Sequence, residues 1–206
     1  MGGAELKRID CLKAIYPELE ECAVVTIMGA VAAELYSLGH RPNFFYLEHA
    51  MGLASSIGLG IALSQPSRKV VVIDGDGSVL MNLGGLTTLA RSRPRNLVHL
   101  IFDNETLLSV GGGAPGGYRW FTTATSTGTD LAGIASAAGF PRARTVRELD
   151  DFEAAALEAL KGHELSCIVA KVDAEMPKSF LMDLHMLENR FEFPRALQLA
   201  IKGRSE

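Results

Sequence analysis

The stretch Lys69–Ser78, Lys-Val-Val-Val-Ile-Asp-Gly-Asp-Gly-Ser, constrains the fold of this chain more than any other feature. Residues Val70 to Ile73 are apolar and mostly β-branched, which is typical of a strand buried on both faces of a parallel sheet. Two glycines then allow a sharp turn and a close approach to a ligand, and Ser78 suits the start of a helix. Because open α/β sheets bind ligands beyond the carboxyl ends of their strands, the stretch predicts a ligand site.

The rest of the chain alternates short apolar strands with helical patterns, which predicts a doubly wound, mainly parallel α/β sheet with helices on both faces. Further strands are expected at residues 22–28, 43–46, 97–102 and 165–171, with a short segment near Ala143. Helices are expected at residues 6–19, 31–38, 51–63, 83–90, 130–138 and 148–160. We expect one domain, with residues 1–175 binding the ligand and residues 176–206 forming a helical appendage of two amphipathic pieces, about 180–190 and 194–202.

Two segments differ in composition from ordinary helices and strands. The helix expected at residues 51–63 consists of glycine, alanine and serine between large apolar residues. Small residues lower helix propensity, so we expect a closely packed neighbour there, such as a second subunit. Residues 107–128 are rich in glycine and threonine and are expected to form a long loop, which in a compact domain is either functional or disordered.

Composition excludes several classes of protein. The chain has 206 residues and a net charge of −4 with both signs interspersed, so neither nucleic acid nor an anionic membrane is an expected partner. There is no long uncharged apolar run and no signal-peptide pattern, so the expected location is the cytoplasm. Cys11, Cys22 and Cys167 are odd in number and lack C-x-x-C spacing, which indicates reduced, structural thiols.

Polar residues follow two strands that are expected to be neighbours. Asp76 follows the central strand, and Asn104 follows the strand at residues 97–102. Their oxygens should meet at the carboxyl edge of the sheet, and such hard ligands suit Mg²⁺, whose coordination is usually completed by water and phosphate oxygens. The glycine turn opens a helix and offers N–H groups to an anion. The sequence therefore predicts a diphosphate site with a bridging metal.

The spacing of these residues resembles the diphosphate-binding motif of thiamine diphosphate enzymes. Gly75-Asp76-Gly77-Ser78 is followed by Asn104, 28 positions after Asp76, and preceded by Ala50-Met51-Gly52, with Met51 25 positions ahead of Asp76. The sequence that begins at residue 51, Met-Gly-Leu-Ala-Ser-Ser-Ile-Gly-Leu-Gly, is similar to a motif of sulfopyruvate and phosphonopyruvate decarboxylases. The resemblance covers about residues 5–175. In the sulfopyruvate enzymes the diphosphate-binding half is a separate subunit of about this size.

The resemblance implies a role for individual residues. Asp76, the side chain of Asn104 and the backbone carbonyl of Thr106 would be the metal ligands. Met51 would prop the cofactor into its V shape, and the main-chain oxygen of His49 would accept from its exocyclic amine. The implied cofactor-binding residues are Met28, Gly29, Ala30, His49, Met51, Gly75, Asp76, Gly77, Ser78, Asn104, Thr106 and Leu107.

The chain departs from the related decarboxylases where substrate is expected. Glu48-His49 stands where they have small residues, and Gly113-Ala114-Pro115 stands where they have Gln-Pro-Thr. The side chain of His49 is therefore our candidate catalytic acid–base group. The alternative is that Glu48 and His49 are a solvated pair at a strand end.

The resemblance further implies the diphosphate-binding subunit of a thiamine diphosphate- and Mg²⁺-dependent lyase that decarboxylates a small 2-oxo acid, such as sulfopyruvate or phosphonopyruvate. The glutamate that activates the cofactor lies on a pyrimidine-binding domain for which this chain has no room. That domain is expected on an alpha subunit, in a hetero-oligomer such as α2β2 or larger. Residues 51–63 and 107–128 are the surfaces expected to face it.

Two alternatives remain open. The same strand resembles the Asp-x-Asp-Gly-Ser opening of haloacid-dehalogenase-type phosphatases, in which Asp74 would be the nucleophile and Asp76 the acid–base group. About seventy residues precede the strand here, whereas that fold normally opens with it. The other alternative is a non-catalytic interaction protein on the same fold.

Overall fold

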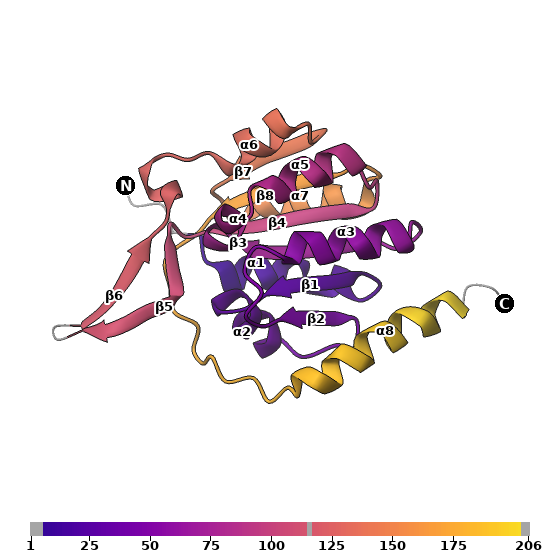
Figure 1. Cartoon of the computed structure of the whole chain (residues 1–206), viewed down its shortest axis with the longest axis horizontal. Coiled ribbons are helices and arrows are strands. Elements are labelled where there is room, and N and C mark those ends of the chain that lie inside the picture. The colour runs from indigo at the N-terminus through magenta and orange to yellow at the C-terminus, as the bar shows by residue number, and fades with distance from the viewer. Residues whose placement is uncertain (1–5, 115–116, 203–206) are drawn as a thin grey trace.

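The computed structural model describes residues 6–114 and 117–202, with only the backbone described for 109–114, 117–120 and 199–202. Its centre is a six-stranded parallel sheet in the order β2-β1-β3-β4-β8-β7 (Figure 1). The strands of this sheet are β1 (Ala23–Ile27), β2 (Phe44–Leu47), β3 (Val70–Gly75), β4 (Leu97–Asp103), β7 (Arg142–Val146) and β8 (Ser166–Lys171). The predicted fold class is confirmed.

Helices cover both faces of the sheet. One face packs against α1 (Arg8–Ile15), α2 (Ala30–Ser37) and α7 (Leu149–Lys161), with the 3₁₀ turn η1 (Tyr16–Leu19) extending α1. The other face packs against α3 (Ala54–Ser64), α4 (Asp76–Met81), α5 (Gly84–Ser92) and α6 (Leu131–Ala138). In β3, Val71 and Ile73 enter the first core while Val70 and Val72 enter the second. This double burial explains the uninterrupted apolar run that the sequence shows.

The buried small residues of α3 serve contacts within this chain, whereas Ser56 and Gly60 are exposed. A side chain at Gly58 would collide with Val72 of β3, so this glycine allows the helix to lie close on the sheet. The closely packed neighbour expected for this helix is therefore the chain's own sheet. The outer side of the helix exposes Leu53, Ile57 and Leu63.

The strand order reverses direction between β1 and β3. From β1 the chain proceeds to β2 on one side, and then returns to place β3 on the other side. At such a switch point the loops after the two strands diverge, which opens a crevice at the carboxyl edge of the sheet. The loops after β1, β3 and β4 therefore meet around one crevice.

Residues 107–128 do not form the expected loop. They contribute most of an antiparallel hairpin, β5 (Thr106–Ala114) and β6 (Gly117–Thr122), followed by the 3₁₀ turn η2 (Ala124–Thr127). The hairpin projects from the body of the domain (Figure 1). The many glycines of this segment lack side chains, so the sequence does not show the apolar–polar alternation that is typical of a strand. The pairing is also irregular, because its register shifts between Leu107 and Gly112. Pro115 lies outside the described residues.

The C-terminal segment also differs from expectation. Residues 173–185 have no regular structure, and one helix, α8 (Met186–Lys202), contains Pro194 and replaces the two expected pieces. Proline predicts a helix boundary because it lacks an N–H donor, yet here the helix continues past it. The helix runs beside the edge strand β2 (Figure 1), where the Asn189 amide donates to Phe44 O at 2.8 Å and accepts from Tyr46 N at 3.2 Å. It thereby covers a sheet edge that would otherwise be open. No helix in the described ranges is both long and apolar enough to cross a membrane.

Candidate functional site

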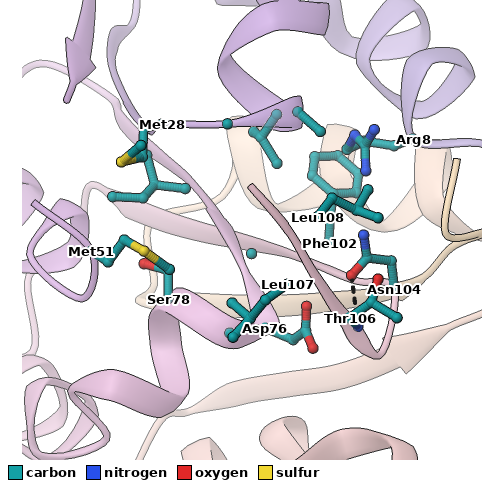
Figure 2. A pocket seen from close by; sticks show the side chains of 16 residues that line it. Arg8, Met28, Met51, Asp76, Ser78, Phe102, Asn104, Thr106, Leu107 and Leu108 are labelled. Carbon is teal, nitrogen blue, oxygen red and sulfur yellow. Dashed lines mark hydrogen bonds between the residues drawn. The ribbon is translucent and has the colours of Figure 1, made fainter. Parts of the chain in front are cut away.

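A pocket lies at the switch point between β1, β3 and β4 (Figure 2). It brings together nearly all residues that the sequence predicted for the cofactor. Those that line it are Met28, Gly29, Ala30, Met51, Gly75, Asp76, Gly77, Ser78, Asn104, Thr106 and Leu107. The sequence did not predict the remaining lining residues, which are Arg8, Ile27, Val31, Phe102 and Leu108.

The first glycine turn, Met28-Gly29-Ala30, connects β1 to α2. Gly29 has φ 89° and ψ −148°, a conformation that is essentially restricted to glycine. It is the N-cap residue of α2, so the amide groups of the first helical turn have no partner within the helix. An anion in the pocket would satisfy them.

The second glycine turn, Gly75-Asp76-Gly77-Ser78, connects β3 to α4, which begins at Asp76. A Cβ atom at Gly77 would collide with the side chain of Leu107. The absence of a side chain at this position lets Leu107, from the first strand of the hairpin, pack directly on the turn. Leu107 thereby lines the pocket next to Gly77.

Two hydrogen bonds hold the turn that carries Met51 against the second glycine turn. Ser78 Oγ accepts from Gly52 N at 2.9 Å, and Asn82 Nδ2 donates to Gly52 O at 2.8 Å. The Ser78 hydroxyl uses a lone pair in this bond, so its hydrogen is still available to a ligand. Figure 2 shows Met51 and Ser78 together on one side of the pocket, opposite Asn104 and Thr106.

The three predicted metal ligands line the same pocket. Asn104 Oδ1 accepts from Thr106 N at 3.1 Å, which makes a tight turn between them (Figure 2). Thr106 Oγ1 is buried and has no hydrogen-bond partner among the described residues, as expected where a polar ligand completes the site. Within the described residues no cluster of three or more His, Cys, Asp or Glu side chains could hold a metal. A metal here would depend on carboxylate, amide, carbonyl and phosphate oxygens together.

The environment of Asp76 favours a bound cation. Its side chain is 2% exposed, and burial raises the pKa of its carboxyl to about 6, with the nearby charge of Asp103 adding to the rise. Hydrogen bonds from Thr123 (2.5 Å) and Thr125 (3.1 Å) to Oδ2 act in the opposite direction. Burial of a carboxylate is unfavourable unless a cation or a proton compensates it.

A second buried carboxylate, Asp103, organises the turn after β4. Its Oδ1 accepts from Thr125 Oγ1 at 2.8 Å and from Glu105 N at 3.2 Å, and its Oδ2 lies 3.0 Å from Lys171 Nζ. Lys171 also pairs with Glu105, whose φ of 60° is uncommon for a residue with a side chain. This network positions the loop that carries Asn104. The sequence does not predict this network, because its members come from three distant segments.

The side chain of the candidate catalytic residue His49 does not line the pocket. It is 81% exposed, and its Nε2 lies 3.6 Å from Glu48 Oε1. His49 has φ 54°, and its backbone N donates to Met28 Sδ at 3.1 Å. The turn therefore holds the backbone of His49 beside the first glycine turn and leaves its imidazole in solvent in this chain.

Asp74 has a different environment from Asp76. It is 1% exposed, accepts from Gly75 N at 3.0 Å and lies 3.4 Å from Nε2 of the buried His99. It does not line the pocket. A nucleophile must reach its substrate, so this placement argues against the phosphatase alternative.

The fold and the pocket agree with comparisons to known proteins. Residues 25–170 match the family described as thiamine pyrophosphate enzyme, C-terminal TPP binding domain. The chain belongs to this family, and thiamine pyrophosphate is the compound called thiamine diphosphate above. Solved structures show the same fold at low sequence identity. The 4-hydroxybenzoylformate decarboxylase of Rhodococcus jostii superimposes with a TM-score of 0.66 at 20% identity, covering 87% of this chain and 34% of that one.

Within the family, the chain is homologous to two groups of decarboxylases. It is 36% identical over 193 residues to the sulfopyruvate decarboxylase subunit beta of Methanocaldococcus jannaschii, covering 93% of this chain and 97% of that subunit. It is 42% identical over 160 residues to the phosphonopyruvate decarboxylase of Streptomyces viridochromogenes. That match covers 77% of this chain but only 38% of the relative's length, so the chain corresponds to one part of a longer enzyme.

Proposed function

We propose that the chain is the diphosphate-binding subunit of a thiamine diphosphate- and Mg²⁺-dependent 2-oxo acid decarboxylase. The observation that carries the proposal is the convergence of Asp76, Asn104 and Thr106 with both glycine turns in one pocket. Relatives that are 36% and 42% identical over most of this chain are named as a decarboxylase subunit beta and as a decarboxylase, whereas a relative that is 32% identical is named as a hydrolase.

The residues of this pocket suit the diphosphate and its metal. Asp76, the side chain of Asn104 and the backbone carbonyl of Thr106 would hold Mg²⁺, since all three offer hard oxygen ligands. The amide groups that open α2 and the hydroxyl of Ser78 would bind the diphosphate. When bound, thiamine diphosphate supplies a nucleophilic carbon that adds to the ketone of a 2-oxo acid and accepts the electrons released with CO₂.

The chain's own residues orient this chemistry and exclude water from it. Leu107 packs over Gly77, which covers the polar floor of the pocket. Met51 is held at the opposite side by the bonds of Gly52 to Ser78 and Asn82. In a pocket with little water, the interactions between the diphosphate and these groups are strengthened.

The proposal includes a partner subunit. Relatives named "subunit beta" imply an alpha subunit, and no glutamate is among the described residues that line the pocket. The glutamate that activates the cofactor would therefore come from a pyrimidine-binding subunit, in a hetero-oligomer such as α2β2. The exposed apolar side of α3 and the hairpin are the surfaces we assign to this contact.

The substrate would enter beside a second cavity of about 270 Å³, which shares Met28, Gly29 and Leu108 with the pocket and reaches Glu48. Among the described lining residues of the two cavities, Arg8 is the single cation, and its guanidinium already pairs with Glu34 at 2.8 and 3.0 Å. A sulfonate or phosphonate tail would therefore need a cation from the partner. A 2-oxo acid with an apolar side chain would not.

We place the protein in the cytoplasm and expect neither nucleic acid nor a membrane as its partner. Cys11, Cys22 and Cys167 are buried and unpaired, and burial raises the pKa of each thiol. Such thiols suit a reducing compartment, where disulfides rarely form.

The test is co-purification followed by an assay. The full chain is expressed with the product of a neighbouring gene that encodes a pyrimidine-binding half, and the complex is assayed for CO₂ release from a panel of 2-oxo acids. We expect release that requires both chains, thiamine diphosphate and Mg²⁺. A complex that holds the cofactor and releases no CO₂ from any member of the panel would contradict decarboxylation.

A further inference from the structure

The threonine-rich segment Thr122-Thr-Ala-Thr-Ser-Thr127, which follows β6, has no role in the function proposed so far. Its hydroxyls are not equivalent. Thr123 and Thr125 are 8% and 4% exposed and point into the protein, whereas the side chain of Thr127 is exposed and bonds only to the adjacent backbone. Buried and exposed residues alternate along this segment, so the hydroxyls of Thr123 and Thr125 face the buried carboxylates of Asp76 and Asp103.

The two buried hydroxyls connect the two buried carboxylates. Thr123 Oγ1 donates to Asp76 Oδ2 at 2.5 Å, and Thr125 Oγ1 lies 3.1 Å from the same oxygen. Thr125 Oγ1 also lies 2.8 Å from Asp103 Oδ1 and 2.8 Å from Thr123 Oγ1. Asp103 is in turn paired with Lys171, so a continuous polar path runs from β8 to Asp76.

The bonds to Asp76 are directional. Each threonine has one hydroxyl hydrogen. That of Thr123 goes to Asp76 Oδ2 at 2.5 Å, and that of Thr125 is shared between Asp103 Oδ1 at 2.8 Å and the same Asp76 oxygen at 3.1 Å. Both contacts are to Oδ2, and the Gly77 backbone also bonds to the carboxylate, so its rotation is fixed. Oδ1 takes no side-chain donor within the described part of the chain, and the side chain lies beside Leu107 and Thr106 in the pocket (Figure 2).

The same segment anchors the hairpin. Thr123 N donates to Glu105 O at 2.9 Å, which joins the residue after β6 to the residue before β5. Glu105 follows Asn104 directly, so one short stretch of backbone links the hairpin base to two of the proposed metal ligands. Thr123 therefore both anchors the hairpin through its backbone and orients Asp76 through its hydroxyl.

We infer that Thr123 and Thr125 are positioning residues of the metal site: they hold Asp76 Oδ2 and so present Oδ1 to the divalent cation. This rests on the proposed function, because it requires that the pocket bind the metal with its diphosphate. Partners that orient a metal ligand typically change metal affinity by about 10- to 100-fold when they are lost.

The test measures metal affinity rather than turnover. Mn²⁺ replaces Mg²⁺, and its binding to the full chain in saturating thiamine diphosphate is followed by electron paramagnetic resonance. Thr123→Val keeps the shape and removes the hydroxyl, and we expect it to weaken Mn²⁺ binding by about 10- to 100-fold. Thr125→Val should act in the same direction with a smaller effect, because the hydrogen of Thr125 lies closer to Asp103 than to Asp76. Thr123→Ser should restore most of the affinity.

Thr127→Val is the matched control from the same segment, and it should leave Mn²⁺ affinity unchanged. If Thr123→Val does not fold, the Thr123→Ala and Thr123→Ser pair measures the same difference. Equal Mn²⁺ affinity in the wild type and in the variants without the hydroxyl overturns the inference. If the wild-type protein binds Mn²⁺ no better than free thiamine diphosphate does, both alone and in complex with its partner subunit, the proposed function is overturned instead.

Discussion

Two clusters of charged side chains in this domain differ in burial and in charge balance. At and beside the pocket, Asp76 and Asp103 are each 2% exposed, and Lys171 pairs with Asp103 but not with Asp76. At the opposite edge of the sheet, on β7 and its neighbours, the cluster of Arg142, Arg144, Glu158 and Glu164 is about half exposed. The outer cluster is balanced, with two cations and two carboxylates, whereas the pocket cluster has a surplus of negative charge.

The difference shows which cluster has a function beyond stability. Exposed ion pairs contribute little to folding, and charges along an edge strand mainly discourage pairing with other chains. A buried carboxylate without a full counter-charge destabilises the fold unless a proton or a cation compensates it, which supports the cation site proposed above.

The largest effect is expected for Asp76→Asn. The variant should weaken binding of Mn²⁺ with thiamine diphosphate by more than about 100-fold, because it removes the charged ligand. Since the pKa of Asp76 is raised to about 6, the ionised carboxylate destabilises the metal-free fold at pH 7, and the variant should gain about 2 kcal/mol in free energy of unfolding. Calorimetric titration and urea denaturation measure the two changes. Asp74→Asn is the control and should keep cofactor binding.

Removing the cation of the pocket cluster should have the next largest effect. Lys171→Met leaves Asp103 buried without its partner, and we expect a loss of about 2 kcal/mol in free energy of unfolding, since breaking a buried pair is more costly than replacing both members. The double variant Asp103→Asn/Lys171→Met should recover part of the loss. Urea denaturation of both variants measures these changes in the free energy of unfolding. A Lys171→Met protein as stable as the wild type would show that the buried pair contributes no more to stability than the exposed pairs do.

The affinity for the metal should depend on pH through Asp76. A proton competes with the metal for a carboxylate whose pKa is about 6, so binding should be nearly constant above pH 7. Below pH 6 it should weaken by about tenfold for each pH unit. The metal-free fold has the opposite dependence, and its stability should rise as the pH falls from 7 towards 4, because the folded state binds the proton more tightly than the unfolded state. Mn²⁺ titrations at several pH values test the first statement, and an unchanged affinity at pH 5 would contradict it.

The smallest effect is expected at the outer cluster. Arg142→Ala removes the pairs with Glu158 and Glu164, all of which are solvent-exposed. We expect the melting temperature to change by less than about 2 °C and cofactor binding to stay the same. A large loss of stability in Arg142→Ala would show that exposed ion pairs contribute as much to stability as the buried ones do.

Features with a local cause could be predicted from the sequence. The β-branched run before Asp74 predicts a buried parallel strand, and the glycines at 75 and 77 predict a turn against a ligand, because both follow from short-range backbone chemistry. The spacing of Asp76 and Asn104 predicts that they converge in one pocket, and they do so because β3 and β4 are neighbours in the sheet. Most of the fold and of the pocket could be predicted from these local features.

Features that depend on distant contacts could not be predicted in the same way. Thr123 lies 47 positions from Asp76, and Lys171 lies 68 positions from Asp103, so nothing local connects them. The hairpin was mistaken for a loop because its strands are rich in glycine. The orientation of the His49 side chain depends on a positive φ that its residue type does not indicate.

The central claim is that the pocket binds thiamine diphosphate through a divalent metal, and thermal unfolding tests it most directly. The full chain, alone and with its partner, is melted with Mg²⁺ and thiamine diphosphate together, with each separately, and with a chelator. Ligand at about 100 times its Kd stabilises by about 2.7 kcal/mol, which for a domain of this size raises the melting temperature by roughly 5 to 10 °C. We predict this rise only when both ligands are present, and its absence in Asp76→Asn. No rise in the wild-type protein, with or without the partner, would contradict the claim.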